Sequence, residues 1–244
     1  MGGASSLLTF RRVAALLALL AALGLYYAFH DRLWNASTWW DIAFVGLVVT
    51  PACLALVLLV LPLRRGRGLL AVGLAFGVLA WAFHVAGWNT PENFAKLFGI
   101  AAVGFAFLQY FEALSWVVLV SLIIPWVDAY SVWRGPTKVI VTKHQHVFSD
   151  FSIAFPIPGE RNAANLGLPD VMFFSLFLAA AARFGLRPRL TWLLTTLSFA
   201  ATLALAVWRN LSGLPALPLL ALGFLVANGD LIWTQLRRDA DARG

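Results

Sequence analysis

Charged residues are scarce in this chain of 244 residues: they make up 12% of it, whereas an average soluble domain has about 25%. So little charge cannot cover a globule with polar surface, which excludes an ordinary soluble domain and a disordered chain. The single cysteine, Cys53, excludes a scaffold held by disulfides. What the chain has instead is 61% hydrophobic residues, arranged in long blocks that are typical of a polytopic helical membrane protein.

Eight blocks are long enough to cross a hydrocarbon core of about 30 Å, which takes about 20 helical residues. They are Val13–Phe29, Ile42–Leu63, Leu69–Trp88, Phe94–Phe111, Ala113–Trp133, Leu166–Gly185, Leu190–Trp208 and Ala216–Trp233. We therefore expect an all-α transmembrane bundle of about eight spans that forms a single integrated membrane domain. Residues 1–112 are expected to be scaffold helices, and residues 113–244 to hold the candidate site and the 134–165 loop.

The net charge of +7 does not point to nucleic acid, because most of the basic residues sit in short clusters between apolar blocks. Such clusters anchor loops at lipid headgroups, so the expected partner is the bilayer. Alternate loops carry eleven Lys and Arg residues on one side of the membrane and seven on the other. The positive-inside rule then predicts cytoplasmic termini and an external long loop.

The longest connection, Arg134–Asn165, has 32 residues. Two segments in it, Lys138–Thr142 and Phe151–Phe155, have the composition of short β-strands. Long loops in compact bundles are usually functional or disordered. His144 and His146 lie near Asp150 without a fourth ligand, so a solvated loop is expected there rather than a metal site.

Two aspartates lie inside apolar blocks, Asp128 in LIIPWVDAYSVW and Asp170 in NLGLPDVMFFSLF. A carboxylate at membrane depth costs about 2.5–3.5 kcal/mol on insertion scales and normally faces the protein interior. The blocks that carry them are antiparallel across the long loop, which places both carboxylates roughly 6–8 Å inside the same membrane face. The spacing therefore permits a carboxylate dyad, while an interhelical hydrogen bond or a headgroup position is the alternative for either residue alone.

A third element falls at the same membrane face, at the start of the last block. Pro215-Ala216-Leu217-Pro218 contains two prolines three residues apart, which leave carbonyl groups without helical donors. Irregular backbone of this kind is tolerated in a membrane only against protein or a water-filled cavity. A proline at an ordinary helix start is the simpler interpretation.

Together, Asp128 in VDAYSVW, Gly167-Leu168-Pro169-Asp170 and Pro215-Ala216-Leu217 resemble the motifs of the presenilin and signal peptide peptidase family of intramembrane aspartyl proteases. The resemblance covers about Phe94 to Trp233 and suggests a homologue of prokaryotic type in a cell membrane. It implies that Asp128 and Asp170 are the catalytic pair. It also implies that Gly167, Leu168 and the Pro215-Ala216-Leu217 triplet bind the substrate, a transmembrane helix, without a metal or cofactor.

The chain departs from the family pattern at two positions: Val127 stands where the family has tyrosine, and Pro169 where it has glycine. The family also has nine spans rather than eight. Two other interpretations therefore stay open: a catalytically silent relative, and a transporter whose paired aspartates bind protons or Na⁺.

The expected reaction is hydrolysis by one ionised and one protonated carboxyl, because two adjacent carboxyls do not both ionise. An unwound substrate needs backbone partners inside the bilayer, which an added β-strand supplies. Lys138–Thr142 is expected to extend such a sheet.

Overall fold

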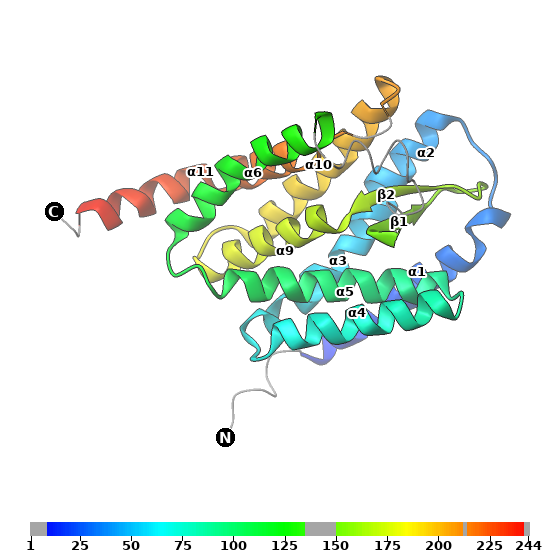
Figure 1. Cartoon of the computed structure of the whole chain (residues 1–244), viewed down its shortest axis with the longest axis horizontal. Helices are drawn as coiled ribbons and strands as arrows, with labels where there is room; N and C mark the ends of the chain where they lie inside the picture. Colours follow the sequence, from blue (N-terminus) through cyan, green and yellow to red (C-terminus); the bar gives the residue numbers. More distant parts are fainter. Residues whose placement is uncertain (1–8, 135–149, 212–213, 242–244) are drawn as a thin grey trace.

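The computed structural model describes residues 9–134, 150–211 and 214–241, and its helices run back and forth beside one another (Figure 1). The helices are α1 (Phe10–Phe29), α2 (Thr38–Phe44), α3 (Thr50–Val60), α4 (Leu69–Val85), α5 (Asn89–Leu108), α6 (Leu114–Trp133), α9 (Leu168–Arg183), α10 (Pro188–Trp208) and α11 (Leu217–Asp241). The π-helical turn η2 (Val45–Val49) joins α2 to α3, and the 3₁₀ turns η1 (His30–Arg32) and η3 (Leu61–Arg65) follow α1 and α3.

Each of the eight predicted apolar blocks contains a helix, which confirms the prediction of a helical bundle. Within the described residues, five helical segments are long and apolar enough to cross a membrane: Phe10–Arg32, Thr38–Arg65, Leu114–Trp133, Pro188–Trp208 and Leu217–Arg238. Helix α4 is a shorter apolar helix. The chain is therefore a helical membrane protein, and five of its helices have the dimensions of a full span.

Several block boundaries differ from those predicted, and two of the differences bear on the candidate site and the hairpin. Residues Leu166 and Gly167 belong to a strand, so α9 begins at Leu168 and Asp170 is its third residue. Helix α5 begins at Asn89 rather than Phe94, because hydropathy alone does not detect the polar first turn that contains Glu92 and Asn93.

The bundle also contains a small sheet. Strand β1 (Ser152–Pro156) pairs antiparallel with β2 (Ala163–Gly167), with Ala154 opposite Asn165. The predicted strand Phe151–Phe155 is therefore confirmed within one residue, while the second strand of the hairpin was not predicted. Lys138–Thr142 lies outside the described residues.

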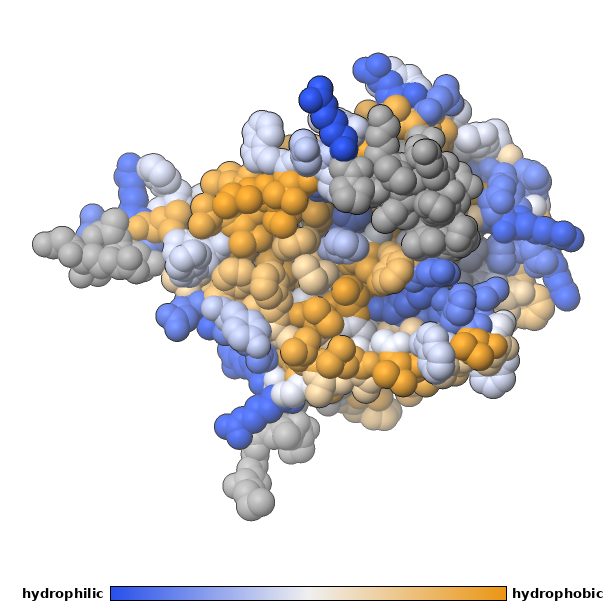
Figure 2. All heavy atoms as spheres, viewed as in Figure 1, coloured by the Kyte–Doolittle hydropathy of each residue, from blue (hydrophilic) through white to orange (hydrophobic). Residues whose placement is uncertain are grey.

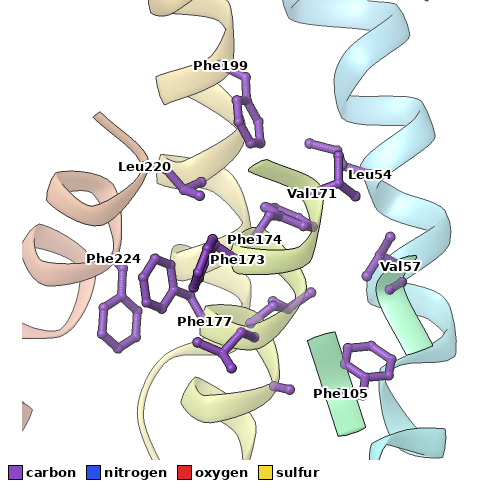
Figure 3. Close-up of a cluster of buried hydrophobic side chains, with 14 of the residues drawn as sticks. Leu54, Val57, Phe105, Val171, Phe173, Phe174, Phe177, Phe199, Leu220 and Phe224 are labelled. Carbon is purple, nitrogen blue, oxygen red and sulfur yellow. The ribbon is translucent and has the colours of Figure 1, made fainter. Parts of the chain in front are cut away.

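Helix α9 forms the centre of the core. Residues Val171 to Ala181, apart from Met172, are buried, as expected for a helix that is apolar on every side. Figure 3 shows its aromatic side chains directed toward α3, α10 and α11. The Phe177 ring stacks on Phe224 of α11 with centroids 4.7 Å apart, and Phe174 meets Phe199 of α10 at 6.1 Å. This packing fixes the position of Asp170, which lies one residue before the buried stretch.

Helix α5 approaches α9 so closely that only glycine fits between them. A Cβ atom on Gly104 would lie 2.5 Å from the Met172 carbonyl oxygen and 2.9 Å from Ser175 Cβ. By contrast, many large apolar side chains on the outer helices are exposed, including Leu74, Trp81, Trp126 and Val226. Figure 2 shows the resulting broad apolar surface, as expected for a protein solvated by lipid.

Candidate functional site

The two predicted aspartates lie on helices that contact one another. Asp128 is in α6, five residues before Trp133 ends the helix, and Asp170 is in the first turn of α9. Both side chains are partly buried. The helices that hold the two aspartates are in contact, and the carboxyl groups are near enough for the charge of Asp128 to act on Asp170.

The third predicted element, the PAL triplet, lies against the first aspartate. Pro215 and Ala216 are buried non-helical residues, and Leu217 is the first residue of α11. The Leu217 N–H donates a 3.0 Å hydrogen bond to Asp128 Oδ2, and the Ala216 N–H also interacts with this carboxyl. Asp128 therefore caps α11, where unpaired N–H groups and the positive end of the helix dipole favour a carboxylate.

The two prolines of this segment restrict which backbone groups can donate. Neither Pro215 nor Pro218 has an N–H, so the donors between them are those of Ala216 and Leu217. Pro218 occupies the second position of α11, where its fixed φ suits a helix start. The segment thus presents two adjacent N–H groups to one carboxylate.

Gly167 shapes the surroundings of the second aspartate. The Asp170 carboxyl turns back toward the end of β2 and interacts with the backbone of Gly167. A Cβ atom at position 167 would lie 3.1 Å from Asp170 Oδ2 and 3.6 Å from Pro169 Cδ. Glycine therefore leaves the space that this carboxyl conformation needs. Leu168 begins α9, with its N–H donating to the Phe151 carbonyl oxygen.

The register of the hairpin determines which backbone groups face away from it. The Leu168 N–H donates to Phe151, and the Ile157 N–H donates to Asn162, so alternate β2 residues, Ala164 and Leu166, also face β1. The N–H and C=O groups of Ala163, Asn165 and Gly167 consequently point to the opposite edge. Among the described residues, none of these edge groups has a backbone partner in another strand. The edge ends at Gly167, beside Asp170.

A buried polar network holds the other edge of the hairpin. The Asn93 side chain pairs with Ala154 through two hydrogen bonds: Nδ2 donates to the carbonyl at 2.9 Å, and Oδ1 accepts from the N–H at 2.8 Å. Tyr27 Oη donates to the same carbonyl at 2.7 Å, and Tyr26 Oη donates to the Pro156 carbonyl at 2.6 Å. Helices α1 and α5 therefore clamp β1, leaving the β2 edge toward the aspartates.

The sequence analysis missed this network and one further feature of the site. Buried Asn93 in the first turn of α5 was the available signal, but it lay outside the block assigned to that span. Pro125 lies inside α6, three residues before Asp128. Because proline has no N–H, the helical hydrogen bond to the Ser121 carbonyl is missing, about one turn before Asp128.

Asp230 of α11 forms a bidentate pair with Arg187 at 2.6 and 2.7 Å, because the turn between α9 and α10 brings Arg187 to α11. His144 and His146 lie outside the described residues.

Comparison with protein-family models, with characterised proteins and with solved structures finds no match to this chain. The resemblance to the presenilin and signal peptide peptidase family stays a prediction that rests on the motifs.

Proposed function

We propose that the protein is an intramembrane aspartyl protease that hydrolyses peptide bonds of transmembrane helices. The observation that carries the proposal is the convergence of three elements: Asp128 and Asp170 on neighbouring helices, and the backbone at the start of α11 that binds Asp128. Two carboxyls that come close enough to interact strongly titrate in two coupled steps. This is the state that general acid–base hydrolysis needs.

In the proposed reaction, the ionised carboxyl takes a proton from water while the protonated carboxyl donates a hydrogen bond to the scissile carbonyl. The water oxygen forms a bond to the carbonyl carbon, giving a tetrahedral intermediate. The C–N bond then breaks as the amine receives a proton, which leaves a carboxylic acid and an amine. The acid and base roles belong to the pair rather than to either residue alone.

The edge of β2 that no other described strand occupies supplies the means of holding an unwound substrate. A substrate strand added to this edge would satisfy its backbone groups inside the bilayer. The outward groups of Ala163, Asn165 and Gly167 lead directly to Asp170. The triplet of Pro215, Ala216 and Leu217 lies next to Asp128, the other member of the pair. It would line the opposite side of the substrate strand.

The proposal includes a membrane topology of eight spans, in which α4, α5 and α9 cross together with the five longer helices. Helix α9, with 16 residues, extends about 24 Å at 1.5 Å per residue, and the surrounding helices shield its buried middle from lipid. Both termini would be cytoplasmic, with the aspartates near the outer face of a cell membrane.

The test is cleavage of a single-span peptide by the purified protein in liposomes, with products identified by mass spectrometry. We expect Asp128→Asn and Asp170→Asn each to abolish product formation, since either removes one titrating group. Asp31→Asn is the matched control, because Asp31 is exposed at the end of α1 and remote in sequence from the pair. Thermal unfolding of each variant verifies that the fold is kept.

The competing functions give different results in the same liposomes. A transporter would show ion flux that depends on both aspartates and would yield no peptide products. A catalytically silent relative would bind the peptide without cleaving it in any variant. Either result would overturn the proposal.

A further inference from the structure

A cavity of about 560 Å³ lies between α4, α5 and the start of the hairpin. Its volume is in the range of about 300–1,000 Å³ found for small-molecule sites. Asp150, Phe151 and Leu168 also line it. Neither Asp128 nor Asp170 lines it, so it is separate from the proposed catalytic pair.

One end of the cavity is charged although it lies among apolar helices. Glu92 is 7% exposed, and its two carboxylate oxygens contact Lys96 Nζ and His84 Nδ1. Asp150 adds a second carboxylate to the lining. Glu92 is in the first turn of α5 and His84 in the last turn of α4. In the proposed eight-span topology, the cluster therefore lies where these helices meet the headgroup layer.

The other end of the cavity is apolar and extends along both helices. Gly77 lies seven residues before His84, and Val103 lies seven residues after Lys96. Each step corresponds to about 10 Å of depth at 1.5 Å per residue. A Cβ atom on Gly77 would meet nothing within 4 Å, so the missing side chain leaves open space there, beside the exposed Trp81.

We propose that this cavity binds a phospholipid with an ethanolamine headgroup, with one acyl chain lying along Gly77 and Val103. The ammonium group would donate to the carboxylates of Asp150 and Glu92, and the phosphate would accept from Lys96. Both signs of charge in the lipid then meet their complement in the cavity.

The balance of charge favours ethanolamine over other common headgroups. An anionic headgroup would place a further negative charge beside the Asp150 carboxylate, which lines the cavity, and Lys96 is already paired with Glu92. A choline headgroup has no N–H to donate to a carboxylate. Ethanolamine supplies three N–H donors and one phosphate.

The test is native mass spectrometry of the delipidated Asp128→Asn protein with dioleoyl phosphatidylethanolamine, phosphatidylcholine or phosphatidylglycerol. Because binding is the readout and the variant cannot cleave, the result is independent of the proposed protease activity. We expect one phosphatidylethanolamine to bind at least tenfold more tightly than either other lipid. Adding Gly77→Phe to the Asp128→Asn protein should remove this binding, because the phenylalanine side chain would fill the apolar end of the cavity.

Gly24→Phe is the matched control, since Gly24 of α1 also has no neighbour within 4 Å of a Cβ position, and it should leave binding unchanged. Lys96→Gln tests the polar end without changing the apolar end, and should weaken binding tenfold. Equal binding of the three lipids, preference for phosphatidylglycerol, or phosphatidylethanolamine binding that survives both Gly77→Phe and Lys96→Gln would overturn the proposal.

Discussion

Asp128 of α6 accepts a hydrogen bond from the Leu217 N–H at the start of α11, at 3.0 Å and across 89 positions of the chain. A carboxylate at membrane depth is thereby matched by a helix N-terminus, whose unpaired N–H groups are equally costly in lipid. By pairing, the carboxylate and the N–H group each remove the cost of leaving the other without a hydrogen-bond partner in lipid. The arrangement also fixes one member of the proposed catalytic pair in space.

Leu217→Pro tests whether the N–H of residue 217 matters. Proline is well tolerated at the first position of a helix, so α11 should still form while Asp128 loses its donor. A hydrogen bond to a charged group contributes about 1.5–3 kcal/mol, so we expect peptide cleavage to slow by roughly 10–100-fold. Leu217→Ala keeps the N–H and removes more side-chain packing. If the alanine variant were the slower of the two, packing rather than the N–H would explain the role of this position.

Gly167→Ala should disturb the Asp170 carboxyl. The new Cβ atom would lie 3.1 Å from Asp170 Oδ2, so the carboxyl must shift by a few tenths of an ångström. Because small misplacements of reacting groups are costly to catalysis, we expect kcat for cleavage to fall by about tenfold or more. Gly24→Ala is the control, as its Cβ meets nothing. An unchanged kcat in Gly167→Ala would show that this glycine is not needed for the position of Asp170.

Long-range hydropathy patterns predicted the helices well, because each apolar block had to become a helix to satisfy its backbone in lipid. The positions of Asp128, Asp170 and the PAL triplet at one end of the bundle also followed, since alternate helices reverse direction. Helix ends were less predictable. Leu166 is apolar enough for a helix, yet it continues the hairpin, because its backbone pairs with Ile153.

The clamp on β1 could not be predicted, because it joins residues that are remote in sequence. Asn93 contacts Ala154 and Tyr27, which lie 61 and 66 positions away. No spacing rule relates α1, α5 and the hairpin. What points to the clamp is the burial of Asn93 in the structure: a polar side chain that is only 7% exposed needs hydrogen-bond partners.

Asn93→Leu should destabilise the protein more than other polar substitutions. It leaves the part-buried N–H of Ala154 without its acceptor, at about 1–3 kcal/mol for an unsatisfied group, while Tyr27 still donates to the carbonyl. We expect the free energy of unfolding, measured by denaturant titration in detergent micelles, to fall by roughly 1–3 kcal/mol. Asn89→Leu, at an exposed position of the same helix, should change it little. Equal effects of the two substitutions would contradict a specific clamp.

Pro169→Gly addresses the departure from the family pattern. Pro169 is exposed at the second position of α9, where proline costs the helix nothing. We therefore expect the wild-type protein to be active. The glycine variant should be less stable by about 0.4–1 kcal/mol, through the added freedom of the unfolded chain, with cleavage within about threefold of wild type. Cleavage by the glycine variant but not by the wild-type protein would instead support the interpretation as a catalytically silent relative.

Asn165→Pro tests the β2 edge as the place where substrate binds. The Asn165 N–H points away from β1, so proline removes a donor from the free edge and leaves the hydrogen bonds of the hairpin in place. A substrate strand that pairs with this edge would lose one backbone hydrogen bond, worth about 0.5–1.5 kcal/mol. We expect kcat/KM for a single-span peptide to fall by roughly 3–10-fold. Asn165→Ala keeps the N–H and loses the same contact of the side chain with Ser152, so it should cleave like wild type. Equal activity of the proline and alanine variants would place the substrate backbone elsewhere, and the start of α11 would then be the remaining candidate.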